Sequence, residues 1–206
     1  MKLKICGMKE SNNIKSIENI EPDYMGFIFW EDSPRYIKDK IPLLKNTIKK
    51  TGVFVDSNIE YITKAVENHN LQAIQLHGNE SPEFCAKLMN KQNIELIKAF
   101  KVDDSFNFDE LKIFENQCDF FLFDTKGKLP GGNGSVFEWS ILKDYKYEKP
   151  FFLSGGIGIE NVDELINLKK TRLPIYAVDV NSKFESQPGL KKLNLLEEFK
   201  NKLYEL

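Results

Sequence analysis

Residues 120–125 read Phe-Phe-Leu-Phe-Asp-Thr, a run of four apolar residues that ends in two polar ones. A short apolar run rich in aromatic residues is typical of a buried strand in a parallel sheet. Side chains alternate along a strand, so Asp124 shares a face with Phe120 and Leu122, while the other two phenylalanines pack beneath helices. The stretch therefore predicts a strand that ends with a carboxyl group at the mouth of a sheet.

Runs of this kind recur along the whole chain, and each is followed by a stretch with helical spacing of apolar residues. The eight predicted strands are residues 3–6, 24–29, 52–55, 73–76, 96–100, 120–123, 151–153 and 176–180. Strict alternation of strand and helix predicts a parallel sheet, because parallel neighbours need a crossover connection. Eight repeats in 206 residues favour a closed (β/α)8 TIM barrel, formed by one domain that spans residues 1–206.

Capping residues mark the starts of several of the intervening helices. Helices are predicted over residues 59–68, 83–89 and 108–114, and a last one from about 190 to 203. The second and sixth loops, residues 30–35 and 125–135, are the longest with unusual composition. Long loops in a compact domain are usually functional, so these two are expected to serve the active site.

Composition restricts the kind of partner and the compartment. Lys and Arg total 29 against 31 for Asp and Glu, so no charge excess favours nucleic acid or an anionic membrane, and a small molecule is the expected partner. The three cysteines lie far apart with no Cys-x-x-Cys pair, which argues against a disulfide framework or a structural zinc site. No run resembles a signal peptide or approaches the roughly 18 apolar residues of a membrane span, so a cytoplasmic protein is expected.

Polar residues and glycines follow most of the predicted strands, at the end where barrel enzymes carry their active sites. In chain order these candidates are Cys6-Gly7, Ser33-Pro34-Arg35, Gln75-Leu76-His77-Gly78, Asp124-Thr125, Ser154-Gly155-Gly156 and Asp179-Val180-Asn181-Ser182. Closure of the barrel would bring all of these segments to one rim.

The residue types alone leave the roles of Cys6 and Asp124 open. A cysteine with an ordinary pKa is only a few per cent thiolate at pH 7, so Cys6 could act as a base only beside a cation or a helix terminus. Cys6 could equally be an inert buried side chain. Asp124 could exchange a proton with a substrate or cap a turn.

The pairs Gly155-Gly156 and Asn181-Ser182 follow the last two predicted strands. Many barrels bind phosphate at this place through backbone N–H groups and a short extra helix, and glycine lets the ligand approach the backbone closely. Two ordinary tight turns are the alternative. The phosphate interpretation is favoured because both loops fit it together.

Arg35, His77 and residues 130–134 could contact a substrate, although each also has a simpler structural explanation. Arg35 could bind a carboxylate through two parallel hydrogen bonds or be a solvated surface charge. His77 could bind substrate or be a structural histidine, and with His69 as the only other histidine a His-based metal centre is not expected. Residues 130–134, Pro-Gly-Gly-Asn-Gly, could form a mobile lid or a flexible connection.

Taken together, these segments resemble the phosphoribosylanthranilate isomerase family of tryptophan biosynthesis over essentially the full length. The segments that carry the resemblance are Lys4-Ile5-Cys6-Gly7, Gly26-Phe27-Ile28-Phe29, Ser33-Pro34-Arg35, Gly52-Val53-Phe54-Val55, Gln75-Leu76-His77-Gly78, Phe123-Asp124, Gly131-Gly132-Asn133-Gly134 with Phe137-x-Trp139, Leu153-Ser154-Gly155-Gly156, Val178-Asp179-Val180-Asn181-Ser182 and Glu185-Ser186-x-Pro188-Gly189. Their order and spacing across eight units are far more specific than any one short motif.

The resemblance implies an Amadori rearrangement of N-(5'-phosphoribosyl)anthranilate to 1-(2-carboxyphenylamino)-1-deoxyribulose 5-phosphate, without a metal or an organic cofactor. It implies that Asp124 is the general acid that protonates the ring oxygen and that Cys6 is the general base that removes the C2 hydrogen. It further implies that Arg35 holds the anthranilate carboxylate. A monomer or a weak homodimer is expected.

The resemblance also implies a phosphate cradle at Gly155-Gly156 and Asn181-Ser182. Asp179 and His77 look like supporting polar groups near the ribose and the anthranilate.

The chain departs from the family pattern at three places near the phosphate and the lid. Asn181 and the pair Lys183-Phe184 stand where the family more often has a serine and Gly-Val, and Asn133 replaces a usual threonine. These changes affect the phosphate contacts and the lid, whereas the acid, the base and the arginine are retained.

Three other classes are alternatives to this resemblance. An indole-glycerol-phosphate synthase, or another phosphate-binding barrel, shares the loops after strands seven and eight, but the lysine and glutamate set of those synthases has no counterpart here. A nucleotide-binding open sheet needs Gly-x-Gly-x-x-Gly after the first strand, whereas Gly7 is followed by Met8-Lys9-Glu10. A non-catalytic barrel is disfavoured because the acid, the base and the carboxylate clamp are all present.

Overall fold

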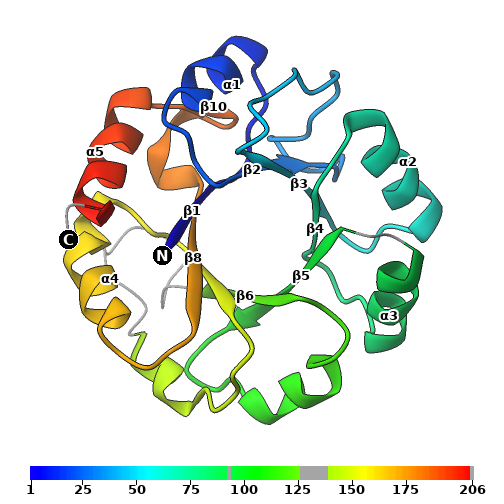
Figure 1. Ribbon diagram of the computed structural model, residues 1–206, viewed down its shortest axis with the longest axis vertical. Coiled ribbons are helices and arrows are strands. Elements are labelled where there is room, and N and C mark those ends of the chain that lie inside the picture. The colour runs from blue at the N-terminus through cyan, green and yellow to red at the C-terminus, as the bar shows by residue number, and fades with distance from the viewer. Residues whose placement is uncertain (92–93, 126–138, 205–206) are drawn as a thin grey trace.

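The computed structural model describes residues 1–91, 94–125 and 139–204 and shows eight strands around one axis (Figure 1). Neighbouring strands are parallel, and β8 pairs with β1, so the sheet closes in the order β1 to β8. The strands are β1 (Lys2–Ile5), β2 (Tyr24–Ile28), β3 (Lys49–Phe54), β4 (Ala73–Leu76), β5 (Glu95–Val102), β6 (Phe120–Thr125), β7 (Phe151–Ser154) and β8 (Ile175–Val180). The predicted barrel is thus confirmed.

Two sets of apolar side chains build the core, one inside the barrel and one between the strands and the helices. The inner set consists of Tyr24, Ala73, Ile97, Ala99, Leu122, Phe152 and Ala177. In β6, Leu122 belongs to the inner set, whereas Phe121 and Phe123 belong to the outer set. This confirms the predicted alternation along β6 and places Asp124 on its inner face.

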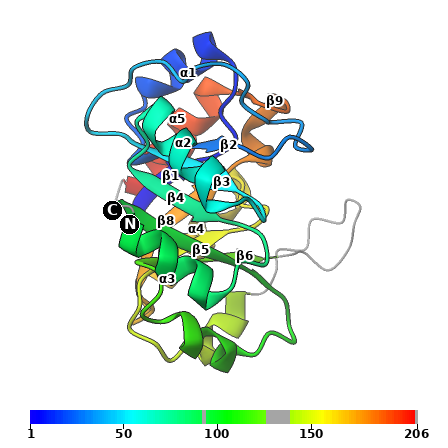
Figure 2. The same cartoon turned by 90° about the vertical axis from the view of Figure 1, so that its right-hand side faces the viewer.

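Helices surround the strands on the outside of the barrel (Figures 1 and 2). The described segments contain the α-helices α1 (Ser11–Glu18), α2 (Ile59–His69), α3 (Pro82–Lys91), α4 (Val162–Lys169) and α5 (Leu193–Tyr204), and the 3-10 helices η1 (Phe108–Phe114), η2 (Trp139–Asp144), η3 (Ile159–Asn161) and η4 (Ser182–Phe184). The helix predicted over residues 59–68 is confirmed as α2, where Asn58 Oδ1 accepts a hydrogen bond from the Tyr61 N–H at 2.8 Å. None of these helices is long and apolar enough to cross a membrane.

The expectation of a helix after every strand is wrong for the connection between β2 and β3. Residues 29–48 form turns and irregular structure. Pro34 and Pro42 explain the difference, because proline lacks a backbone N–H donor and its ring clashes with a preceding helical turn. Buried isoleucines hold this segment on the barrel instead: Ile37, Ile41 and Ile48.

Two further predicted helices differ from the structure. Residues 108–114 form the 3-10 helix η1, where the Asn107 side chain accepts from the Asp109 N–H only two residues ahead, so the chain turns tightly at the start. The last helix begins at Leu193 rather than about residue 190, because β9 (Glu185–Gln187) and β10 (Leu190–Lys191) form a hairpin first. Gly189, with φ +88°, makes the turn of this hairpin.

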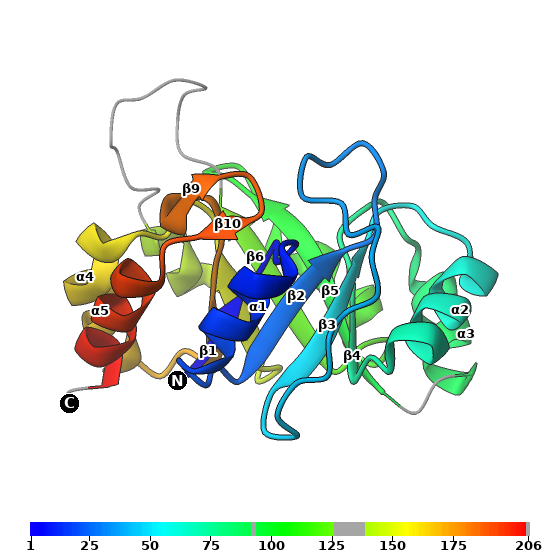
Figure 3. The same ribbon diagram turned by 90° about the horizontal axis from the view of Figure 1, so that it is seen from above.

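The two ends of the barrel carry different polar groups. Figure 3 shows the N-terminus and the end of α5 at the amino ends of the strands and the β9–β10 hairpin at the carboxyl ends. At the amino end, the Tyr24 hydroxyl lies 2.8 Å from Glu95 Oε2 and 3.2 Å from the Tyr176 hydroxyl. Lys49 pairs with Glu95, and the Lys2 ammonium lies 5.3 Å from the centre of the Tyr176 ring. This network closes the amino end.

Candidate active site

A cavity of about 290 Å³ opens at the carboxyl ends of the strands. Eight of the nine predicted site residues line it: Cys6, His77, Asp124, Gly155, Gly156, Asp179, Asn181 and Ser182. The structure therefore brings together residues from β1, β4, β6, β7 and β8 that are separated by up to 176 positions (Cys6 to Ser182) in the chain.

The Cys6 thiol sits directly after β1 and against β2. The Cys6 N–H donates to the Val180 carbonyl at 2.9 Å, which continues the pairing of β1 with β8. A Cβ atom at Gly26 would lie 2.6 Å from Cys6 Sγ, so the glycine in β2 leaves the space that the thiol occupies. Burial raises the pKa of the thiol above its ordinary value, although the nearby Lys4 ammonium opposes this effect. The thiol is therefore protonated in the free protein at neutral pH.

A buried ion pair lies inside the barrel below Cys6. Lys4 Nζ is 2.8 Å from Asp179 Oδ2, and the two side chains are 0% and 5% exposed. Lys4 shares the inner face of β1 with Cys6, as the alternation predicts. Among the described residues, Asp179 Oδ1 has no hydrogen-bond partner, and Asp179 lines the cavity.

His77 connects β4 to Asp124 on β6. Its Nε2 lies 3.3 Å from Asp124 Oδ2, and its Nδ1 lies 2.7 Å from the Gln75 amide nitrogen. Because an amide nitrogen can only donate, Nδ1 accepts, and the ring proton resides on Nε2. His77 thus donates to the Asp124 carboxylate and orients it. The two side chains are 25% and 31% exposed, so water can reach Asp124.

The turn after β7 has a backbone conformation that favours glycine. Gly155 and Gly156 have φ angles of +104° and +65°, a region that residues with a Cβ atom rarely adopt. A Cβ atom at Gly156 would meet no atom within 4 Å, so the backbone there faces open space. Asn181 and Ser182 reach the same cavity from the end of β8.

Arg35 is the one predicted site residue outside the lining of this cavity. Its side chain packs over Gly7, whose added Cβ would lie 2.7 Å from Arg35 Cδ. Its guanidinium binds Glu185, with Nη2 at 2.6 Å from Oε2 and Nε at 3.0 Å from both oxygens. The structure thus places Arg35 beside the cavity, over Gly7, which is the residue that follows Cys6 in the chain. The predicted lid at 130–134 lies outside the described residues.

Several residues of the site had no predicted role. Trp30, Ser33 and Gln75 line the cavity, and the last two were noted only as parts of longer segments. Alternation along β4 could have identified Gln75, because it shares a face with His77. No group of three or more His, Cys, Asp or Glu side chains in residues 1–91, 94–125 and 139–204 is arranged to hold a metal ion.

The barrel is closed, and a thiol, a carboxyl group and a glycine turn lie together at one of its rims. These features place the chain in the class of (β/α)8-barrel enzymes. A family model described as N-(5'phosphoribosyl)anthranilate (PRA) isomerase matches residues 3–202. The chain therefore belongs to the N-(5'-phosphoribosyl)anthranilate isomerase family. The predicted family, the isomerase activity of the aldose–ketose type and the place in tryptophan biosynthesis are confirmed.

Individual relatives support this assignment. The N-(5'-phosphoribosyl)anthranilate isomerase of Parabacteroides distasonis is 40% identical over 97% of this chain and 91% of its own. The crystal structure of the phosphoribosyl anthranilate isomerase from Thermotoga maritima is 30% identical, with a TM-score of 0.83 and all of both chains covered. A third structure, 27% identical with a TM-score of 0.82 over all of both chains, is a phosphoribosyl anthranilate isomerase in complex with reduced 1-(o-carboxyphenylamino)-1-deoxyribulose 5-phosphate.

Proposed function

We propose that this chain acts as one domain that rearranges N-(5'-phosphoribosyl)anthranilate to 1-(2-carboxyphenylamino)-1-deoxyribulose 5-phosphate, with Asp124 as general acid and Cys6 as general base. One observation carries the proposal: the thiol after β1 and the carboxyl at the end of β6 line the same cavity as the glycine turn after β7. The relative crystallised with a reduced form of this product supports the same choice of ligand.

The acid step opens the ribose ring. Protonated Asp124 delivers its proton to the ring oxygen, the C1–O bond breaks, and the nitrogen lone pair forms a protonated Schiff base. The hydrogen bond from His77 Nε2 at 3.3 Å fixes one oxygen of the carboxyl group, which leaves the other to face the sugar. The exposure of Asp124 lets water return the proton after each turnover.

The base step forms the enolamine. The positive Schiff base acidifies the C2 hydrogen, and the Cys6 thiolate removes this proton, so that the C2–H electrons neutralise the nitrogen. The enolamine then tautomerises to the aminoketone. Each turnover leaves Cys6 with one proton more and Asp124 with one proton fewer. The thiol proton then passes to water while water returns a proton to Asp124, which restores the starting pair. Burial raises the pKa of the Cys6 thiol, so its proton must pass to water before it acts as the base, and the positive charge of the bound Schiff base favours the thiolate that results.

The ends of the substrate are held at two sides of the cavity. Gly155, Gly156, Asn181 and Ser182 form the phosphate cradle, since two glycines at positive φ let backbone N–H groups approach the phosphate oxygens. Arg35, whose side chain lies with that of Asn181 over Gly7, holds the anthranilate carboxylate. Asp179 Oδ1 accepts a hydrogen bond from a ribose hydroxyl, and His77 supports Asp124.

The direct test of the activity is fluorescence-monitored consumption of N-(5'-phosphoribosyl)anthranilate by the purified chain without added metal. The expected result is catalytic turnover that is unchanged by a chelator. The E198Q variant, which removes one partner of an exposed ion pair in α5, provides a matched control with normal turnover. A silent assay of the folded wild type would contradict the proposal.

We further propose that the chain acts in the cytoplasm as a monomer or a weak homodimer and has no nucleic acid or membrane partner. One relative, from Thermotoga maritima, is a dimeric phosphoribosylanthranilate isomerase from which monomers have been generated. Analytical ultracentrifugation over a range of concentrations tests the oligomeric state. A stable tetramer would contradict it.

A further inference from the structure

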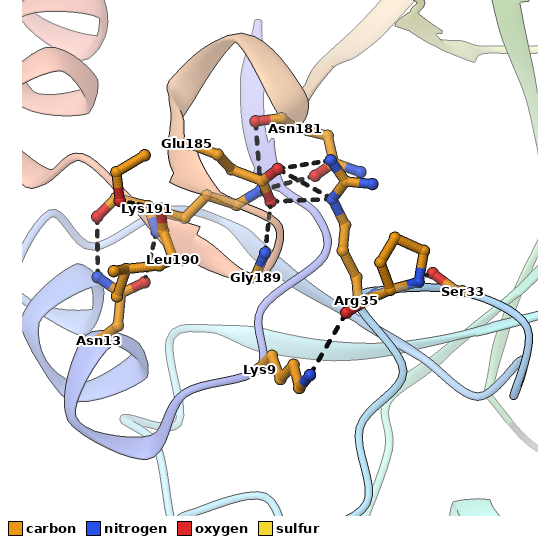
Figure 4. A network of polar contacts seen from close by, with 11 residues as sticks. Lys9, Asn13, Ser33, Arg35, Asn181, Glu185, Gly189, Leu190 and Lys191 are labelled. Atoms are coloured by element: carbon orange, nitrogen blue, oxygen red, sulfur yellow. Dashed lines mark hydrogen bonds and ion pairs between the residues drawn. The ribbon is translucent and has the colours of Figure 1, made fainter.

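The β9–β10 hairpin contains a buried carboxylate, Glu185, that is held from three directions (Figure 4). Arg35 binds both of its oxygens, Lys191 Nζ lies 2.7 Å from Oε1, and the Gly189 N–H donates to Oε1 at 3.1 Å. The Glu185 side chain is only 4% exposed. A carboxylate with this many fixed donors has one orientation, so it can fix the orientation of a group that binds it.

Lys191 links Glu185 to the end of β8. Its ammonium has three acceptors, which are Glu185 Oε1 at 2.7 Å, Asn181 Oδ1 at 2.6 Å and the Asn181 carbonyl at 3.2 Å. The side chain is 0% exposed, and an amino group with three acceptors uses all three protons of the charged form. Lys191 is therefore occupied within the protein. Asn13 in α1 anchors it further through two hydrogen bonds to its backbone, at 2.8 and 2.9 Å.

The charges of this cluster leave one positive charge in excess. Two cations, Arg35 and Lys191, face one anion, Glu185. Burial by itself would raise the pKa of Glu185, but the hydrogen bonds from Arg35 and Lys191 outweigh it and hold the pKa below its ordinary value. The guanidinium of Arg35 has five N–H bonds, of which Glu185 takes one from Nε and one from Nη2. Three N–H bonds of Arg35 remain for another anion.

We propose that Glu185 and Lys191 are positioning residues of the active site: Glu185 orients Arg35 toward the substrate carboxylate, and Lys191 fixes Asn181 in the phosphate cradle relative to it. The hairpin thereby sets the distance between the two anion-binding ends. Glu185 and Arg35 stay paired when substrate binds. This inference rests on the proposed function, which assigns the two ends to a carboxylate and a phosphate.

The first test follows the two arginines of the chain, Arg35 and Arg172, by the NMR signals of their Nε–H groups. Arg172 is exposed and serves as the internal reference. In the wild type, the Arg35 Nε–H is expected to exchange with water at least about tenfold more slowly than that of Arg172. In E185Q this protection is lost, whereas E198Q retains it. Equal protection in E185Q and wild type would overturn the proposal.

The second test measures the dissociation constants of anthranilate and of inorganic phosphate, together with kcat and KM. E185Q is expected to weaken the binding of anthranilate and to raise KM about tenfold, while kcat stays within about twofold of the wild type. Phosphate binding should be unchanged in this variant. K191M is expected to weaken the binding of both anthranilate and phosphate, because it removes the hydrogen bonds that hold Glu185 and Asn181. Unchanged phosphate binding in K191M overturns the link to Asn181. A loss confined to kcat in E185Q overturns the orienting role.

A wild-type measurement covers the case in which E185Q or K191M does not fold. Saturating anthranilate should leave the Arg35 Nε–H as protected as before, since Glu185 keeps its hold on the guanidinium. Exchange that rises to the rate of Arg172 would show that Arg35 leaves Glu185, and it would overturn the proposal. Because both binding tests use anthranilate and phosphate, they remain decisive even if the rearrangement itself is not observed.

Discussion

The polar groups at the amino end and at the carboxyl end of the barrel differ in how completely they are paired. At the amino end, Tyr24, Tyr176, Glu95 and Lys49 satisfy one another. Three buried polar atoms lack a partner among the described residues: Asp179 Oδ1 and Gln75 Oε1, which belong to cavity-lining residues, and Thr51 Oγ1 within β3. An unsatisfied buried polar atom costs about 1–3 kcal/mol. The pairing at the amino end thus contributes to stability, whereas the unpaired atoms of Asp179 and Gln75 next to the cavity cost stability.

The largest expected effect separates the two ends by activity. Asp124→Asn removes the proton that opens the ring, so kcat should fall by about 10²- to 10⁴-fold, while the urea midpoint of unfolding stays near that of the wild type. Steady-state kinetics and denaturation on the same preparation measure both. Turnover close to that of the wild type would remove Asp124 from the role of acid.

Cys6→Ser should reduce kcat by about 10²-fold or more, because a hydroxyl is a far weaker base than a thiolate in the same position. Binding of the reduced product analogue, measured by calorimetry, should change little. The matched variant is Cys85→Ser, at a cysteine that is buried on the outer side of the barrel. Equal kinetic losses in the two variants would indicate a structural rather than a catalytic role.

Arg35→Met should chiefly weaken substrate binding. Because a charge-assisted, hydrogen-bonded pair is lost, KM should rise about 10- to 100-fold, with a smaller change in kcat. The measurement is the kcat and KM split for N-(5'-phosphoribosyl)anthranilate. An unchanged KM would exclude Arg35 from the carboxylate site.

Alkylation by iodoacetamide should distinguish the thiol at the carboxyl end from those in the core. Burial raises the pKa of Cys6, and it raises the pKa values of Cys85 and Cys118 to about 11 and about 12. At pH values below the pKa of a thiol, the thiolate fraction rises about tenfold per pH unit. The alkylation rate of Cys6 should therefore still rise above pH 9, where the alkylation rate of a free thiol levels off. Peptide mapping should show Cys6 reacting first, because it lines the cavity. A plateau for Cys6 near pH 8 would contradict the raised pKa.

The smallest expected effect belongs to the amino end. Tyr24→Phe removes the hydroxyl that lies 2.8 Å from Glu95, while Lys49 still pairs with that carboxylate, so the free energy of unfolding should fall by about 1 kcal/mol. Both kcat and KM should remain those of the wild type. A kinetic loss as large as that of the Arg35 variant would show that the amino end also contributes to catalysis.

The sequence was sufficient for features that follow from local periodicity. Alternation along β6 separated Leu122 from Phe121 and Phe123 and placed Asp124 inward. Parallel strands have their carboxyl ends on one rim, so polar residues after the strands could be assigned to one cavity. The same reasoning failed for residues 29–48, because Pro34 and Pro42 prevent the helix that the strand–helix repeat predicts there.

Contacts between distant parts of the chain were beyond such reasoning. Arg35 and Glu185 are 150 residues apart, and Lys4 and Asp179 are 175 apart. Neither pair is marked by any local spacing, because only the closure of the sheet brings them together. The resemblance pointed to Arg35 as the carboxylate clamp, but its pairing with a buried glutamate required coordinates.

The pairing of β1 with β8 also determines when the site comes into being. Cys6 directly follows β1, the first strand of the barrel, whereas Asp179 lies in β8, the last strand of the barrel, and Asn181 directly follows it. A chain emerging from the ribosome therefore has no complete site until its final strand has been synthesised and has docked on the first. Such long-range closure is slow compared with the pairing of neighbouring strands. Recovery of activity during refolding should therefore coincide with the last kinetic phase, which makes catalysis itself a reporter of ring closure.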